Sequence, residues 1–149
     1  VTRIGVHTAE ANVGNFGSTE RFEFKALGDA VNTAARLEGL NKYFGTRILV
    51  TQQTKDFCSD IPFRKVGGVI VKGKTEPIHV YEPLSPARAN DAQTASYNAA
   101  YDLMREKSPE ALAAFEKHCA DFPDDSLAQY HVERLREGEQ GDVFAMAEK

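Results

Sequence analysis

Apolar residues recur along the first half of the chain with two different periods, which predict alternating strands and helices. Residues 3–8 alternate apolar and polar positions, as a half-buried strand does. Residues 29–44 instead place apolar side chains at helical spacing, with Asp29 as the expected N-cap and Gly45 as the expected C-cap. The apolar side of this helix is predicted to comprise Val31, Ala34, Ala35, Leu37, Leu40 and Phe44.

The pattern changes again after the helix. Residues 47–50 form a short predicted strand, and Thr51 caps a brief helix that runs to about Cys58. Residues 63–71 and 78–81 read as a hairpin whose turn contains KGKTEP. The order strand, helix, strand, short helix, hairpin indicates an α+β fold.

The composition becomes helical and acidic beyond the segment LSPARAND, residues 84–91. Residues 85–149 hold 13 acidic and 7 basic side chains, whereas the preceding part holds 9 acidic and 11 basic. We therefore predict two units, residues 1–84 and residues 85–149.

The second unit is predicted to consist of helices. Residues 95–122 read as a helical hairpin interrupted at KSPE, with Ser108 as cap and Pro109 in the next helix's first turn. A further helix is expected to begin at Asp125 or Ser126. These residues resemble one tetratricopeptide-like helix pair plus one more helix. A solenoid needs about three such repeats, so we expect these helices to cover the preceding unit or a dimer partner.

Charge and hydropathy narrow the function classes. The net charge is −4 with a pI near 5.6, and no basic stripe appears, so nucleic acid is not expected as a partner. No apolar run approaches the ~18 residues that cross a bilayer, so no membrane contact by this segment is expected. Cys58 and Cys119 are isolated and the histidines lack ligand spacing, so we predict no zinc and a reducing, cytoplasmic setting.

Asn32 and Arg36 are the first candidates for chemistry. They lie four residues apart in the predicted helix, about 40° apart around it, so both can reach one anion. Arginine can donate two parallel hydrogen bonds to phosphate oxygens. Short residues lie between them, which would let the helix pack close to another backbone: Thr33, Ala34 and Ala35. The alternative is a surface arginine that pairs with Glu20 or Glu23.

Asn32 and Arg36 lie within a longer stretch of recognisable sequence motifs. Residues 3–84 contain, in order, RIGVHTAEANVGNFGS, RFEFKALGDAVNTAARLEGLNKYFGTRILVT and VKGKTEPIHVYEPL. This stretch resembles, collinearly, the C-terminal part of the class III adenylate and guanylate cyclase catalytic domain of the bacterial sensor type. The resemblance implies the C-terminal part of a ferredoxin-like nucleotide cyclase fold, followed by the helical extension.

The resemblance implies an activity and assigns residues to it. A nucleotide cyclase of this class converts ATP to cyclic AMP and pyrophosphate in intracellular signal transduction, by attack of the ribose 3′ oxygen on the α-phosphorus. Arg36 would contact the phosphate as charge develops, and Asn32 would orient the ribose. A lysine of the KGK turn would reach the terminal phosphates, and spacing alone does not choose between Lys72 and Lys74. The alternative for each lysine is a solvated turn residue.

Lys25 departs from the pattern of the family. Relatives usually place Thr, Asp or Cys at this purine-selecting position, and lysine cannot accept a hydrogen bond from the adenine amino group. Lys25 could instead meet a guanine acceptor or fold against Glu23 or Asp29. The alternatives are therefore a GTP-using cyclase and a catalytically silent cyclase-like module that binds nucleotide or dimerises. A third hypothesis is a helical interaction module carried by residues 90–149.

The resemblance also implies cofactors and partners. Class III cyclases use two Mg²⁺ or Mn²⁺ ions held by two aspartates of the domain's N-terminal half, so these ligands are expected upstream of residue 1, and we find no replacement here. The sites of the family form between two domains packed head to tail, which predicts a homodimer in which Arg36 acts across the interface. An upstream sensor domain is also expected, and the alternative to a wholly cytoplasmic protein is that this segment is the cytoplasmic part of a membrane-anchored sensor.

Overall fold

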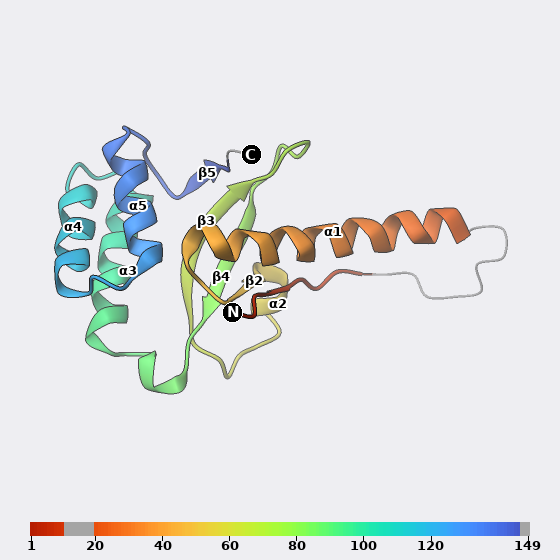
Figure 1. The fold of residues 1–149 in the computed structure, drawn as a ribbon, viewed down its shortest axis with the longest axis horizontal. Helices are drawn as coiled ribbons and strands as arrows, with labels where there is room; N and C mark the ends of the chain where they lie inside the picture. The colour runs from red at the N-terminus through yellow and green to blue at the C-terminus, as the bar shows by residue number, and fades with distance from the viewer. Residues whose placement is uncertain (11–19, 147–149) are drawn as a thin grey trace.

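A computed structural model describes the backbone of residues 1–10 and 20–146, and the side chains of all of these except 20–28 (Figure 1). In chain order the elements are β1 (Ile4–Val6), α1 (Glu20–Phe44), β2 (Ile48–Thr51), α2 (Gln52–Lys55), β3 (Phe63–Ile70), β4 (Ile78–Pro83), the 3₁₀ helix η1 (Pro86–Arg88), α3 (Ala92–Arg105), α4 (Ala111–Asp121), α5 (Ser126–Arg136) and β5 (Val143–Ala145).

The strands form one mixed sheet in the order β1-β2-β4-β3-β5. β1 runs parallel to β2, and β5 runs parallel to β3, whereas β4 is antiparallel to both of its neighbours. The predicted α+β class, the order of elements up to β4 and the hairpin are confirmed. β5 was not expected from the sequence, and it returns the chain from the helices α3–α5 to the sheet.

α1 packs closely on β1 and β2. A Cβ atom at Gly5 would overlap the backbone of Ala34 and Glu38, so the helix lies directly against this bare position. The expected close approach of the helix to another backbone is therefore confirmed at Ala34. Leu37, Leu40 and Phe44 are buried in the core.

The prediction that Val31 and Ala35 belong to the apolar, buried side of α1 is wrong. Val31 is 62% exposed, and Ala35 is exposed as well. At ~100° per residue both lie more than ~100° around the helix from Leu37, so they cannot share its buried face.

The ends of α1 differ in how well they were predicted. Gly45, with φ of +68°, follows Phe44, which confirms the predicted end of the helix. The predicted start at Asp29 is wrong, because the helix begins at Glu20 and runs through this position. Asp29 is therefore not an N-cap.

Thr51 stands at the predicted N-cap position of α2 but does not cap the helix. Thr51 does precede α2, but its side chain makes no capping hydrogen bond. Its hydroxyl instead lies 3.0 Å from Nδ1 of His7, a contact that joins the start of the chain to β2. α2 ends at Lys55, short of the predicted Cys58.

Of the two predicted helix caps in the second half, the one of α5 is confirmed and Ser108 as the cap of α4 is wrong. Asp125 caps α5 by accepting a hydrogen bond from the Ala128 amide, which selects it over Ser126. The Ser108 hydroxyl accepts from the Glu110 amide at 3.2 Å, but α4 begins only at Ala111. Pro109 therefore lies before the helix, and its predicted place in the first turn is wrong.

Helices α3, α4 and α5 pack in series, and α3 and α5 contact β3 and α1 respectively (Figure 1). One core joins both halves of the chain: Leu37, Leu40, Phe44, Leu49, Val66, Val69 and Val80 with Tyr97, Ala100, Tyr101, Met104, Ala111, Phe115, Leu127, Ala128, Val132 and Phe144. The division into units at residue 84 and the tetratricopeptide-like character of the helices stay predictions.

A buried cluster of charges, here called the junction, ties the helices to the sheet. It consists of Arg64 of β3, Glu82 of β4, His118 of α4 and Asp125 at the start of α5. Arg64 Nη1 donates to both carboxylate oxygens of Asp125, at 3.1 and 2.9 Å, and His118 Nε2 lies 2.7 Å from Oδ2. Burial alone would raise the pKa of Asp125, but the hydrogen bond and charge of Arg64, with His118 and the Ala128 amide, lower it to about 2.

Candidate functional site

Asn32 and Arg36 lie on the exposed surface of α1. Arg36 Nη1 donates a long hydrogen bond of 3.5 Å to the backbone oxygen of Lys72, in the turn between β3 and β4. The contact joins positions 36 residues apart in the sequence. The fold therefore places the helix that carries the Asn/Arg pair directly beside the turn that carries the KGK motif.

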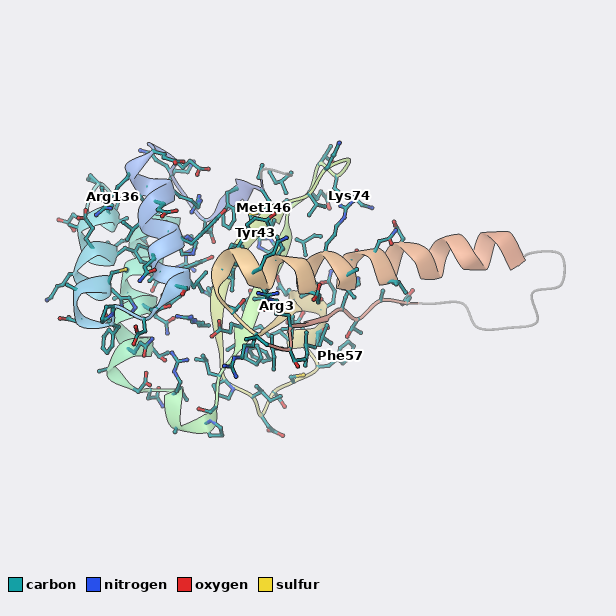
Figure 2. The ribbon with its side chains drawn as sticks, in the orientation of Figure 1. Arg3, Tyr43, Phe57, Lys74, Arg136 and Met146 are labelled. Atoms are coloured by element: carbon teal, nitrogen blue, oxygen red, sulfur yellow. The ribbon has the colours of Figure 1, made fainter. Side chains whose placement is uncertain are left out.

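The turn is held close to α1 by a second contact. Gly73 has φ of +83°, a left-handed conformation that favours glycine, and the Lys74 amide donates to the Val71 oxygen at 3.1 Å. Lys74 Nζ lies 3.5 Å from Oδ2 of Asp29, one helical turn before Thr33. Figure 2 shows Lys74 between the turn and α1. We call this surface the site face and define it by Asn32, Arg36, Lys72 and Lys74.

The ion pair between Lys74 and Asp29 is open to solvent, with side chains 52% and 73% exposed. Exposed pairs of this kind contribute little to stability, because water screens the charges and both side chains lose freedom. Lys74 can therefore exchange Asp29 for another anion at little cost. The pairing was not predicted, because 45 residues separate the partners and no local pattern joins them.

Lys25, the predicted purine-selecting residue, lies on α1 seven residues before Asn32. Its side chain falls outside those that the structure describes, as do the side chains of Glu20 and Glu23. The predicted alternatives for Lys25, and a pairing of Arg36 with either glutamate, thus stay predictions.

An open cleft of about 700 Å³ adjoins the site face. Asp29 and Lys74 line it, but Asn32 and Arg36 do not. Three carboxylates also line it: Glu10, Asp56 and Glu76. Two histidines, His7 and His79, complete its titratable residues. Burial lowers the pKa of His7, which favours its neutral form. This acidic lining disfavours a polyphosphate inside the cleft, so an anion fits better on the Arg36 side of α1.

Residues 1–10 and 20–146 also bear on metal binding, on disulfides and on membrane insertion. Within these ranges no group of three or more His, Cys, Asp or Glu side chains is arranged to hold a metal ion. Cys58 and Cys119 are free thiols. Among the helices described, none is long and apolar enough to cross a membrane.

Comparison with known sequences assigns residues 1–82 to a protein family. A family model described as the Adenylate and Guanylate cyclase catalytic domain matches these residues. Adenylate cyclase 1 of Rhizobium meliloti (strain 1021) is 42% identical over 89 residues, which cover 59% of this chain and 13% of that protein. The adenylate cyclase of Anabaena cylindrica is 40% identical over 83 residues, covering 53% of this chain and 16% of that protein.

A third relative matches the helical half as well. The terminal-differentiation specific adenylate cyclase of Dictyostelium discoideum is 31% identical over 143 residues, which cover 89% of this chain and 7% of that protein. The chain thus spans less than a fifth of the length of each of these three relatives. No solved structure gave a significant match.

Proposed function

The chain belongs to the adenylate and guanylate cyclase catalytic domain family, as its motifs indicated, and we propose that it forms part of an adenylate cyclase. The proposed reaction converts ATP to cyclic AMP and pyrophosphate in intracellular signalling. The names of the relatives from Rhizobium, Anabaena and Dictyostelium support adenine as the base. The observation that carries the proposal is the contact between α1 and the β3–β4 turn, through Arg36 and Lys72.

The reaction explains why these side chains would be needed together. Attack of the ribose 3′ oxygen on the α-phosphorus builds negative charge on the non-bridging oxygens and on the departing pyrophosphate. Arg36 is exposed and can turn its planar donor fork from the Lys72 oxygen to a phosphate. Asn32, four residues earlier on α1, would hold the ribose hydroxyl in line.

Lys72 and Lys74 would bind the terminal phosphates. Lys74 already holds one carboxylate, that of Asp29, in an exposed and weak pair. A triphosphate carries more charge than a single carboxylate and would displace it. The backbone of Lys72 is fixed beside Arg36, so this lysine would reach phosphates next to the one that Arg36 contacts.

The family implies two divalent ions, but the described residues do not fit them, because they contain no suitable cluster of ligands. In the proposal, Mg²⁺ or Mn²⁺ is held by residues outside those described here.

The exposure of the site face fits a site completed by a second domain. Asn32 and Arg36 project from α1 into solvent, where a partner can approach them. We propose a head-to-tail homodimer in which Arg36 serves a nucleotide held by the partner, as an arginine supplied in trans does in phosphoryl transfer. A C2 axis would create two equivalent sites. A sensor domain elsewhere in the protein and a cytoplasmic location belong to the same proposal.

Lys25 favours a second candidate function. A hydrogen-bond donor at the purine-selecting position suits an acceptor of guanine better than the amino group of adenine. The other possibility is a module that binds nucleotide without turnover. The family membership is equally compatible with these alternatives, so the base and the turnover need one common test.

The test is an assay of the full-length protein with ATP and with GTP, each with Mg²⁺ and Mn²⁺, beside Arg36→Ala and Lys25→Thr. The proposal predicts cyclic AMP from the parent, its loss in Arg36→Ala, and a higher ATP to GTP preference in Lys25→Thr. Cyclic GMP from the parent would replace adenylate by guanylate cyclase. A parent that is silent under every condition, with product only from Lys25→Thr, would establish the silent module instead.

A further inference from the structure

The last strand of the chain lies against the base of the turn that carries Lys72 and Lys74. β5 pairs with β3 in the register Gly68 to Val143, Val69 to Phe144 and Ile70 to Ala145. Ile70 is the last residue of β3 and lies two positions before Lys72. The Gly68 amide also donates to the Asp142 oxygen at 2.7 Å. β5 therefore pairs with β3 up to its last residue, where the turn that carries Lys72 and Lys74 begins.

Phe144 connects this strand to α1 as well. Its ring is 3% exposed and stands nearly perpendicular to the ring of Phe44, with centroids 6.2 Å apart. Phe44 is the final residue of α1, the helix of Asn32 and Arg36. On its other side Phe144 packs on Gly67, where a Cβ would come within 2.6 Å of the Phe144 ring. Phe144 thus contacts α1 and also β3, the strand that leads into the turn of Lys72 and Lys74.

The helices fix the position of Phe144. The guanidinium of Arg134 on α5 lies 4.1 Å from the centre of the Phe144 ring and donates to the Gly141 oxygen at 3.1 Å. Tyr101 on α3 donates to Asp142 at 2.7 Å, and Tyr130 on α5 lies 3.1 Å from the sulfur of Met146. These contacts hold the segment around β5 at both ends.

From this chain of contacts we propose that Phe144 is a positioning residue for cyclisation. It sets the placement of α1 against the β3–β4 turn, and so the distance between Arg36 and the lysines. The inference rests on the proposed function of the site face, and it makes the helical half a working part of the enzyme rather than a separate module. Displacement of a catalytic group by about 1 Å can cost up to ~100-fold in rate, so loose support is expected to appear in kcat.

Phe115 offers a matched control. It is as deeply buried as Phe144, but its ring contacts are with Tyr97 of α3 and His131 of α5. Neither of those helices carries a residue of the site face. His131 in turn lies 6.0 Å from the Phe144 ring, so Phe115 is one side chain further from α1 and the turn. Leucine at position 144 or at position 115 removes a buried ring while it keeps an apolar side chain, so both variants weaken the core of the same protein.

The kinetic test compares Phe144→Leu with Phe115→Leu in the full-length protein, at a temperature where both are folded by circular dichroism. We expect Phe144→Leu to lower kcat about tenfold with KM changed less than about threefold, and Phe115→Leu to leave kcat within about twofold. Phe44→Leu should match Phe144→Leu, and the double variant should be no slower than either single one. Equal kcat losses for Phe144→Leu and Phe115→Leu, or additive losses for positions 44 and 144, would overturn the inference.

A second readout needs no activity and separates this inference from the proposed function. Hydrogen exchange of residues 71–77 in the full-length protein should accelerate in Phe144→Leu by at least about threefold and stay unchanged in Phe115→Leu. Acceleration confined to α3–α5 in both variants would overturn the inference even if the parent is an active cyclase. If the parent forms no cyclic product, the proposed function fails, and this exchange pattern still decides whether Phe144 positions the turn.

Discussion

The site face and the junction use the same kinds of side chain in opposite surroundings. On the site face, Lys74 and Asp29 meet in solvent at 3.5 Å. In the junction, Arg64 donates hydrogen bonds to both carboxylate oxygens of Asp125. The side chains of Arg64 and Asp125 are only 6% and 1% exposed. The exposed pair can be exchanged for a ligand, whereas the buried pair cannot be broken without leaving a charge in the core. Binding and stability are thus expected to reside in different parts of the molecule.

Substitution of Arg64 in the junction should change the molecule most, through its stability. Arg64→Ala leaves Asp125 and Glu82 without their shared cation, so we expect a loss of ~3–5 kcal/mol in the free energy of unfolding by urea denaturation. Arg136→Ala is the matched control, because it breaks an exposed pair with Glu116, 60% and 45% exposed. It should cost less than ~1 kcal/mol. Similar losses in the two variants would erase the contrast between buried and exposed pairs.

The next effect is on turnover and comes from the site face. Arg36→Ala should lower kcat about 100- to 1000-fold, the usual range for a lost transition-state donor, with the melting temperature unchanged because Arg36 is exposed. Arg36→Lys keeps the charge but not the fork and should recover only part of the rate. A melting temperature that falls with kcat in Arg36→Ala would mean that Arg36 supports the fold instead.

Acid should destabilise the fold through a buried histidine of α5. Burial, followed by the charge of Arg134, lowers the pKa of His131 to about 3, while the unfolded chain titrates near 6.5. Because the folded pKa is the lower one, stability is complete above pH 6.5 and falls by ~1.4 kcal/mol per unit as the pH drops toward 3. Asp125 adds to the loss below pH 3.8. Urea titrations at pH 7.5 and 5 should differ by about 2 kcal/mol, and less in His131→Gln.

The smallest expected effects come from the exposed pair itself. Lys74→Ala should raise KM for the triphosphate about threefold, because one solvent-exposed charge contact is lost, and should leave kcat near the parental value. Asp29→Asn removes the competing carboxylate and should lower KM about twofold. Steady-state kinetics on both variants measure these changes, and a rise of KM in Asp29→Asn would show that Asp29 does not compete with the triphosphate for Lys74.

Local features of the sequence were predictable, and long-range ones were not. The spacing of Asn32 and Arg36, the end of α1 at Gly45 and the hairpin around KGK all depend on residues close in the chain. The Arg64–Asp125 contact spans 61 residues, and Arg64 looks like any polar residue of an alternating strand. β5 has three residues, too few to show a period, so the contact between Phe144 and Phe44 carried no signal. The wrong start of α1 came from a good capping residue inside a longer helix.

The most direct test of the site face is a binding footprint that needs no catalysis. Hydrogen exchange of the full-length protein can be measured with and without 3′-deoxy-ATP, which lacks the attacking oxygen and cannot be cyclised. We expect slower exchange in residues 71–77 and unchanged exchange in residues 111–121 of α4. Saturating analogue that leaves residues 71–77 unchanged, or that protects α4 instead, would contradict the assignment of the triphosphate to α1 and the turn.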